Sequence, residues 1–148
     1  MTLQRFIDAQ TPVIEEATAE LAAGSKKSHW MWFVFPQLSG LGRSDIAHFY
    51  GISDLEEARR YLAHPVLGVR LRRHVQLMIE HKAKTARQIL GTPDDLKFRS
   101  CLTLFLTASR AEADRSLFEA ALCQFYGGER DPRTVMLLEG RGLPQSDI

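Results

Sequence analysis

The sequence predicts an all-α protein, a single compact multihelical domain of about seven to nine short helices. Three observations favour this fold class. Apolar residues recur at spacings of three and four along most of the chain, alternation of period two is nearly absent, and proline and glycine stand at regular helix boundaries. The chain has 148 residues, of which 45% are hydrophobic, and this is enough to bury a core. Residues 1–142 are predicted to form the domain and residues 143–148 a flexible tail.

Residues that precede proline predict where helices begin. Proline has no amide hydrogen to lose at the first helical position, and its fixed φ already suits a helix. The pairs are Thr11-Pro12, His64-Pro65, Thr92-Pro93 and Asp131-Pro132. Thr and Asp side chains accept a hydrogen bond from free amides one turn further on, and His is the weaker cap. Ser53 and Glu56 are predicted to form a capping box at another start.

Apolar stripes at helical spacing indicate the bodies of the helices in chain order. They cover residues 13–21, 55–62, 66–79, 102–106 and 117–125. Glycines that follow helical patterns mark the expected ends, at Gly24, Gly51, Gly91, Gly127 and Gly140. The one strand-like run, Trp30–Phe35, has no partner strand in the chain, so we expect it to form a helix or a tight turn.

Charge and hydropathy argue against several classes of function. The chain carries 19 Lys and Arg against 18 Asp and Glu, a net charge of +1. Because this balance creates no strong field, we expect no binding to nucleic acid or to anionic membranes. The longest apolar run has six residues, whereas a membrane-spanning helix needs about 20. The N-terminal residues lack the pattern of a signal peptide, so a cytoplasmic location is expected.

Cysteine and histidine positions predict no metal site. Cys101 and Cys123 lie in apolar helical patterns and match no metal-binding spacing. We expect both to be buried free thiols of a cytosolic protein, and the alternative is a disulfide of a secreted protein. The five histidines show no HxxxH or HExxH relation, and acidic loops of the calcium-binding type are missing. The sequence identifies no cofactor and no reaction.

The most unusual segment is residues 26–44, KKSHWMWFVFPQLSGLGRS, which contains both tryptophans. One interpretation is a buried core segment whose rings supply packing area, with cation–π contacts from the neighbouring lysines. The other is the wall of a ligand site, in which Trp30 and Trp32 stack on a flat ligand while His29 and Gln37 orient it.

A glycine-rich turn, Gly40 to Ser44, leads from this segment into a predicted helix. Free amides at a helix start, together with glycines that permit close approach, can bind an anion. The turn matches neither of the established phosphate-binding glycine motifs. The plainer interpretation is that Gly40 and Gly42 form the turn and Ser44 caps the helix.

These features support the hypothesis that the protein binds a small anionic ligand. This ligand would be phosphorylated and aromatic, such as a nucleotide. Lys97 has a plainer interpretation as the partner of Asp94, three residues earlier. In an enzyme, His29 or His64 would be the general acid–base, because an unperturbed histidine pKa suits that role. The hypothesis requires the side chains of Lys27, His29, Arg70 and Lys97 to converge on one pocket. The predicted ligand-binding residues are Lys27, Trp30, Trp32, Gln37, Gly40, Gly42, Ser44, Arg70 and Lys97.

The alternative hypothesis is a protein–protein interaction module that uses the aromatic segment His29–Gln37. Aromatic residues and arginine dominate the energetics of interfaces, so the same side chains would serve a protein partner. Exposure distinguishes the two hypotheses, because an interaction module needs an exposed apolar patch. In a third interpretation the segment is core only.

Several motifs resemble the bacterial domain-of-unknown-function family 1810. They are residues 28–37 (SHWMWFVFPQ), 40–42 (GLG), 61–71 (YLAHPVLGVRL), 97–105 (KFRSCLTLF) and 131–134 (DPRT), with Arg5-Phe6 and Ala9-Gln10 near the start. The resemblance covers nearly the whole chain and implies a compact multihelical domain of this size. It implies no activity. Members are sometimes labelled calpastatin, but that inhibitor is a long disordered chain, whereas this composition folds.

Overall fold

A computed structural model describes residues 2–140, and these residues form ten helices, one isolated parallel bridge between Leu38 and Ile52, and no strand. The all-α prediction is confirmed, with slightly more helices than expected because α3, α4 and α7 are single turns. The predicted tail lies outside the described residues. The helices are α1 Gln4–Gln10, α2 Ile14–Ala23, α3 Met31–Val34, α4 Asp45–Phe49, α5 Leu55–Ala63, α6 Leu67–Ile79, α7 Ala86–Leu90, α8 Asp94–Ala108, α9 Glu112–Tyr126 and α10 Pro132–Leu138.

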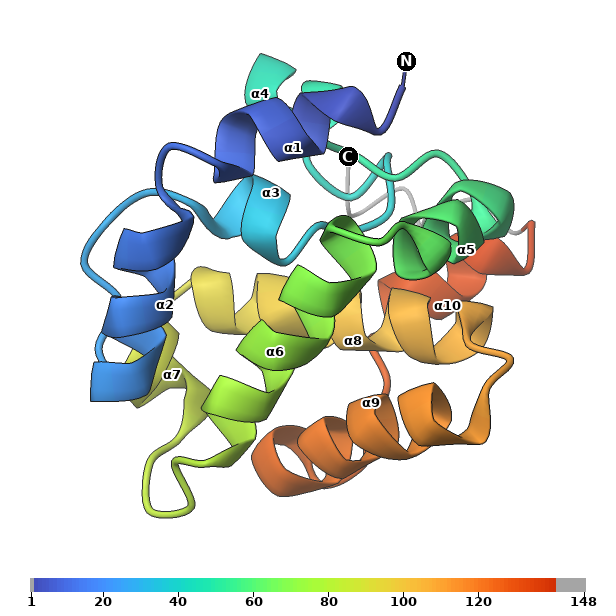
Figure 1. Ribbon diagram of the computed structural model, residues 1–148. Helices are drawn as coiled ribbons and strands as arrows, with labels where there is room; N and C mark the ends of the chain where they lie inside the picture. The colour runs from blue at the N-terminus through green and yellow to red at the C-terminus, as the bar shows by residue number, and fades with distance from the viewer. Residues whose placement is uncertain (1, 141–148) are drawn as a thin grey trace.

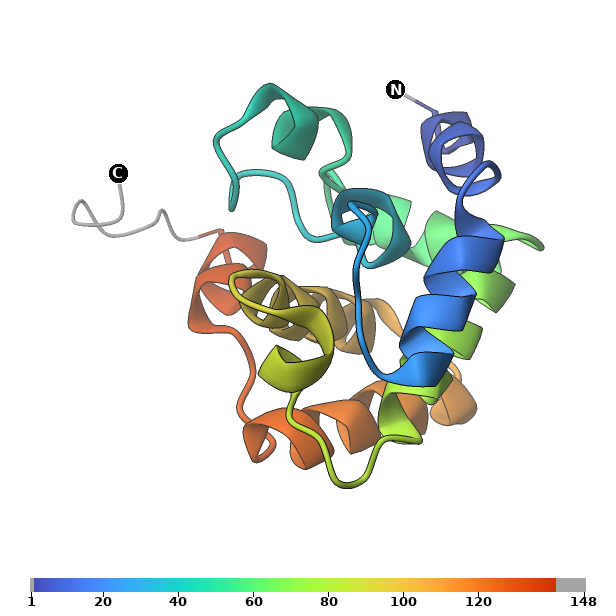
Figure 2. The ribbon, with the colours of Figure 1, turned by 90° about the vertical axis from the view of Figure 1, so that its left-hand side faces the viewer.

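Helix α8 is the centre of the fold. Every residue from Ser100 to Leu106 is buried, as expected for a helix that is enclosed on all sides. Helices α5, α7, α9 and α10 pack against it, and α6 packs against α2, α5 and α9 (Figure 1). Figure 2 shows α4 set apart from this body, beyond α3.

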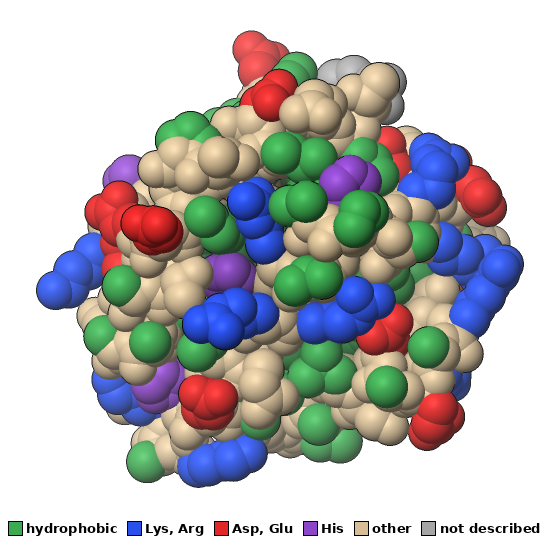
Figure 3. Space-filling view, viewed as in Figure 1, with side chains coloured by type: hydrophobic (Ala, Val, Ile, Leu, Met, Phe, Trp, Pro, Cys, Tyr) green, Lys and Arg blue, Asp and Glu red, His purple; other side chains and the backbone are tan. Residues whose placement is uncertain are grey.

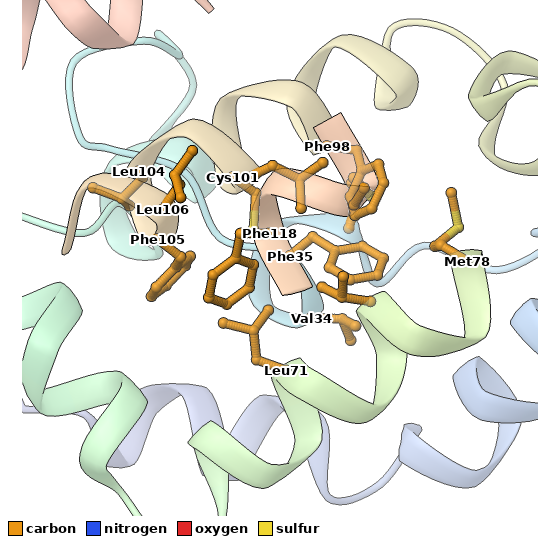
Figure 4. Close-up of a cluster of buried hydrophobic side chains, with 14 of the residues drawn as sticks. Val34, Phe35, Leu71, Met78, Phe98, Cys101, Leu104, Phe105, Leu106 and Phe118 are labelled. Carbon is orange, nitrogen blue, oxygen red and sulfur yellow. The ribbon is translucent and has the colours of Figure 1, made fainter. Parts of the chain in front are cut away.

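The core is built largely from aromatic rings. Phe35 and Phe98 lie 4.7 Å apart between ring centroids, and Tyr61 and Phe105 lie 5.3 Å apart. Figure 4 shows this cluster, with Val34 and Phe35 from the α3 segment between side chains of α6 and α8. Rings at these distances and tilts combine a large buried area with favourable edge contacts. The strand-like run of the sequence is therefore a helical turn in the core, as predicted.

Two of the predicted helix starts are confirmed by their hydrogen bonds. Asp131 Oδ2 accepts from the amide of Thr134 at 2.9 Å, with Pro132 as the first helical residue of α10. His64 Nδ1 accepts from the amides of Val66 at 3.1 Å and Leu67 at 3.3 Å, at the start of α6. In both cases the side chain before the proline accepts hydrogen bonds from free amides near the helix start, as predicted.

The other predicted starts need correction. Thr11 ends α1, and α2 begins only at Ile14, while α8 begins after Pro93 without a side-chain cap. The capping box predicted for Ser53 and Glu56 is not formed, and the residue that caps α5 is Asp54, one position later. Asp54 Oδ1 accepts from the amide of Glu57 at 2.8 Å, and Glu57 Oε1 accepts from the amide of Ser53 at 3.0 Å.

The helix start at Asp54 instead of Ser53 has a physical reason. Glu57 is buried and forms an ion pair with Arg5 at 3.2 Å, so its carboxylate must face inward. An unpaired buried carboxylate would be strongly destabilising, and the contact with α1 therefore sets the register of α5.

The two cysteines differ. Cys101 is buried, and its burial raises the pKa of the thiol, but Cys123 is exposed, which corrects the prediction that both are buried. Both are free thiols. Within residues 2–140, no helix is long and apolar enough to cross a membrane, and no group of His, Cys, Asp and Glu is arranged to hold a metal.

Candidate functional site

The aromatic segment of the sequence lies mostly in the core. Trp30, Met31, Val34 and Phe35 are almost fully buried, whereas Trp32 is only half-buried. Trp30 donates a hydrogen bond from Nε1 to Glu20 Oε1 at 2.9 Å, so its polar atom is satisfied inside the protein. The segment therefore presents no exposed aromatic surface of the kind that an interaction module needs.

Glu20 on α2 fixes the loop that precedes α3. Its carboxylate accepts hydrogen bonds from the amides of Lys27 at 2.8 Å and Ser28 at 2.9 Å, from the Ser28 hydroxyl at 2.6 Å and from the Trp30 indole. Burial raises the pKa of Glu20, but these four hydrogen bonds outweigh it and lower the pKa to about 2. The backbone of Lys27 is thus part of a structural contact, and its side chain is exposed.

Asp94, at the start of α8, joins two lysines that lie over the two tryptophans. Lys26 Nζ is 3.0 Å from Asp94 Oδ2 and 5.1 Å from the ring centroid of Trp30. Lys97 Nζ is 3.7 Å from Asp94 Oδ1 and 4.5 Å from the ring centroid of Trp32. The predicted pairing of Lys97 with Asp94 is therefore present. Of the cation–π contacts predicted from the neighbouring lysines, the one between Lys26 and Trp30 is present, whereas the contact on Trp32 comes from Lys97.

A pocket of about 300 Å³ opens beside Lys97, between α8, the loop after α3 and the start of α10. We call it the basic pocket. Its polar lining consists of Gln37, Lys97, Arg99, Ser100, Asp131 and Arg133. Its remaining lining consists of Leu41, Gly42, Pro93 and Leu96. Three cationic side chains face one carboxylate, and that carboxylate already caps α10 through Thr134.

The three cations of the basic pocket are bound to different extents. Arg99 is held by the carbonyl oxygens of Glu129 at 2.9 Å and Arg130 at 2.8 Å. Lys97 has the long contact to Asp94 and the cation–π contact with Trp32. Among the described residues, the buried Nε of Arg133 has no hydrogen-bond partner, and no carboxylate lies within ion-pair distance of its guanidinium.

Four of the predicted ligand-binding residues meet at or next to this pocket. Gln37, Gly42 and Lys97 line it, and Trp32 lies against Lys97. Arg99 and Arg133 were not predicted. Arg133 follows the Asp131-Pro132 helix start by one residue, but nothing local indicates that α10 packs against α8.

The other predicted residues lie elsewhere. Lys27 and His29 are exposed on the loop between α2 and α3, and Arg70 donates from Nη1 to Gln10 Oε1 at 3.3 Å, near the end of α1. None of these three lines the basic pocket. The single site that the sequence hypothesis required, with Lys27, His29, Arg70 and Lys97 in one pocket, is therefore not formed.

The glycine-rich turn matches its plainer interpretation. Ser44 Oγ accepts from the amide of Ala47 at 3.1 Å and caps α4, and Gly40 has a φ of 98° that suits a turn. A Cβ at Gly42 would lie 2.6 Å from the Cβ of Ala47, so glycine is needed for this close approach. His64 is also structural, because its Nδ1 caps α6.

Surface charge adds no further site on the face seen in Figure 3. Basic and acidic side chains lie interspersed there with apolar ones. This distribution agrees with the net charge of +1.

Comparison with known proteins gives a family but no activity. The chain matches a family model described as "Protein of unknown function (DUF1810)" over residues 1–138. It is also similar to a solved structure, the crystal structure of the conserved hypothetical protein Rv1873 from Mycobacterium tuberculosis. The two share 50% sequence identity with a TM-score of 0.89, and the match covers 93% of this chain and 96% of that chain. No curated protein matches the chain. With a match that extends over nearly its full length, the chain belongs to the DUF1810 family of proteins of unknown function.

Proposed function

We propose that the protein binds a small anionic ligand, a phosphorylated molecule, in the basic pocket. The observation that carries this proposal is the buried, unpartnered Nε of Arg133 in the pocket wall. A buried donor without an acceptor is costly, and more than about 90% of such groups in native proteins have a partner. An oxygen atom of an anion in the pocket supplies the missing acceptor when the guanidinium turns towards it.

The rest of the lining fits an anion attached to a small organic body. The guanidinium of Arg133 offers parallel donors that match phosphate or carboxylate oxygens, and Lys97 adds a second positive charge. Leu41, Pro93 and Leu96 form an apolar part of the lining. The volume of about 300 Å³ is at the lower end of the range for small-molecule sites. Nucleotides are the largest phosphorylated molecules that we consider as ligands.

Thermal unfolding tests this proposal directly. We would compare inorganic phosphate, ribose 5-phosphate and adenosine monophosphate, with sodium chloride at matched ionic strength. A ligand at a hundred times its Kd adds about 2.7 kcal/mol to the free energy of unfolding, which raises the Tm by several degrees. The absence of a shift with all three phosphates would overturn the proposal.

A pair of arginine variants locates the site. Arg133→Gln removes the guanidinium from the pocket and should abolish the shift. Arg130→Gln is the matched control, because Arg130 lies three residues earlier in the chain, pairs with Glu119 at 3.2 Å on the surface and does not line the pocket. An equal shift in both variants would place the anion elsewhere and overturn the assignment.

A further inference from the structure

Residues 39–51 form a loop that leaves the body of the protein and returns to the same point. The amide of Ser39 donates to the carbonyl of Ile52 at 2.7 Å, and the amide of Ile52 donates to the carbonyl of Gln37 at 2.9 Å. These bonds join the two ends of the loop. Gly51 permits the close approach, because a Cβ there would lie 2.8 Å from the Cα of Ser39. The geometry is that of an Ω-loop, a type that is frequently functional.

Between its joined ends, the loop packs against the core only through the partly buried side chains of Leu41 and Tyr50 and contributes no fully buried residue. No residue from Ser39 to Tyr50 is buried, and Ile46 and Phe49 on α4 are 41% and 46% exposed. Figure 2 shows α4 standing apart from the body formed by α8 and α9. Arg5 binds the carbonyls of Phe49 at 2.8 Å and Gly51 at 3.0 Å, so the returning end is anchored. Few buried contacts with firm ends are typical of a segment that opens locally.

This loop covers a second, much smaller space next to the basic pocket. We call it the Trp32 chamber. Two of its lining residues, Gln37 and Lys97, also line the basic pocket, and two others, Ala47 and Tyr50, belong to the loop. The chamber is filled almost completely, with room of only about 10 Å³. A ligand group can therefore enter it only if the loop moves.

Lys97 couples the two spaces. Its ammonium group lies over the ring of Trp32 at 4.5 Å, and its contact with Asp94 is long, at 3.7 Å. An anion in the basic pocket attracts this ammonium group more strongly than a neutral ring does. When Lys97 turns to the anion, the face of Trp32 becomes available to a planar group. Stacking on an aromatic side chain is favourable for any flat heterocycle.

We propose that loop 39–51 is a hinged cover of the Trp32 chamber. We further propose that the ligand is a phosphate ester with a planar ring, and that this ring replaces Lys97 on Trp32 when the cover lifts. This inference rests on the proposed function, because the phosphate group occupies the basic pocket. It adds the class of the organic group and the moving part of the site.

Two ligands that differ only in the ring test the inference. Adenosine monophosphate and ribose 5-phosphate carry the same phosphorylated sugar. By calorimetry we expect the nucleotide to bind at least about tenfold more tightly, which is the effect of one stacked base. In Trp32→Leu this advantage should disappear, while the affinity for ribose 5-phosphate stays the same.

A second variant covers the case in which Trp32→Leu does not fold. Ala47→Leu enlarges a side chain of the cover that lines the chamber, so it should also remove the advantage of the nucleotide. The matched control is Ala19→Leu, at an exposed position on α2. If Trp32→Leu or Ala47→Leu folds and still binds adenosine monophosphate more tightly than ribose 5-phosphate, the stacking on Trp32 is overturned.

Hydrogen exchange tests the hinge. The amides of Ala47, His48 and Tyr50 are bonded within the loop, and they should exchange faster with the nucleotide bound than with ribose 5-phosphate bound. Unchanged or slower exchange would overturn the hinged cover. Equal affinity for the two ligands, with both lost in Arg133→Gln, would overturn this inference and leave the proposed function intact. Binding of neither ligand would overturn both.

Discussion

Trp30 and Trp32 lie two residues apart, and each has a lysine ammonium group over its ring, yet their surroundings differ. Trp30 is 1% exposed and its indole is bonded to Glu20, and the side chain of its lysine, Lys26, is only 7% exposed. Trp32 is half-buried, and the side chain of Lys97 is 23% exposed at the edge of the basic pocket. The inner pair has all its partners within the protein. The outer pair lies at the edge of the basic pocket, where Lys97 and Trp32 are partly accessible to solvent.

The largest effect on stability is expected when the Glu20 carboxylate, which binds Trp30 and the loop before α3, is replaced. Glu20→Gln replaces a carboxylate that accepts four hydrogen bonds with an amide that also carries donors. Hydrogen bonds to charged groups are strong, so we expect the free energy of unfolding to fall by about 3 kcal/mol in urea denaturation. Glu16→Gln is the control, because Glu16 is exposed and shares with Glu20 the single hydrogen of the Ser28 hydroxyl. Equal losses in the two variants would contradict the role of Glu20.

Acid should weaken the same region gradually. The pKa of Glu20 is lowered from its ordinary value of 4.5 to about 2, so the carboxylate stabilises the folded state above pH 4.5. This contribution is lost as the pH falls from 4.5 towards 2, because the unfolded chain takes up the proton first. Denaturation midpoints measured down this range should decrease less in Glu20→Gln than in the unaltered protein. A parallel decrease in both would show that other carboxylates dominate.

The two lysines provide a smaller and more direct contrast. Lys26→Met removes the close partner of Asp94 from a nearly enclosed site, and we expect a loss of about 2 kcal/mol in the free energy of unfolding. Lys97→Met removes a longer and more exposed contact, so the loss should be under about 1 kcal/mol. The binding of phosphate should respond in the opposite order, with loss only in Lys97→Met. A larger loss of stability in Lys97→Met, together with a loss of phosphate binding in Lys26→Met, would contradict these two assignments.

The elements that could be predicted from the sequence are those that depend on near neighbours. The cap of α10 by Asp131 and of α6 by His64 involves residues two or three positions apart. The start of α5 was predicted one residue early, at Ser53 instead of Asp54, because its register depends on Arg5, 52 positions away from Glu57. Local propensity starts a helix, and a buried ion pair decides its register.

The candidate site divides in the same way. Trp32, Gln37 and Lys97 were identified as unusual for their type and place, and the structure brings them together. Arg70 was identified by the same reasoning, but α6 directs it to the end of α1. Arg133 was missed because its position beside Lys97 depends on how α10 packs against α8. One chain gives the residue types, and only the packing of distant helices shows which of them share a pocket.

The effect expected at Arg133 has the opposite sign. In the absence of ligand, its buried Nε has no acceptor, so the residue costs free energy where it stands. Arg133→Met keeps the apolar stem and removes the unpartnered donor. We therefore expect the unliganded protein to become more stable by about 1 kcal/mol, measured by urea denaturation, while phosphate no longer stabilises it. Arg99→Met should instead destabilise, because Arg99 donates to two carbonyls near the start of α10. If Arg133→Met gains stability and loses phosphate binding, Arg133 serves the ligand and not the fold. A loss of stability in both variants would make Arg133 a structural residue like Arg99.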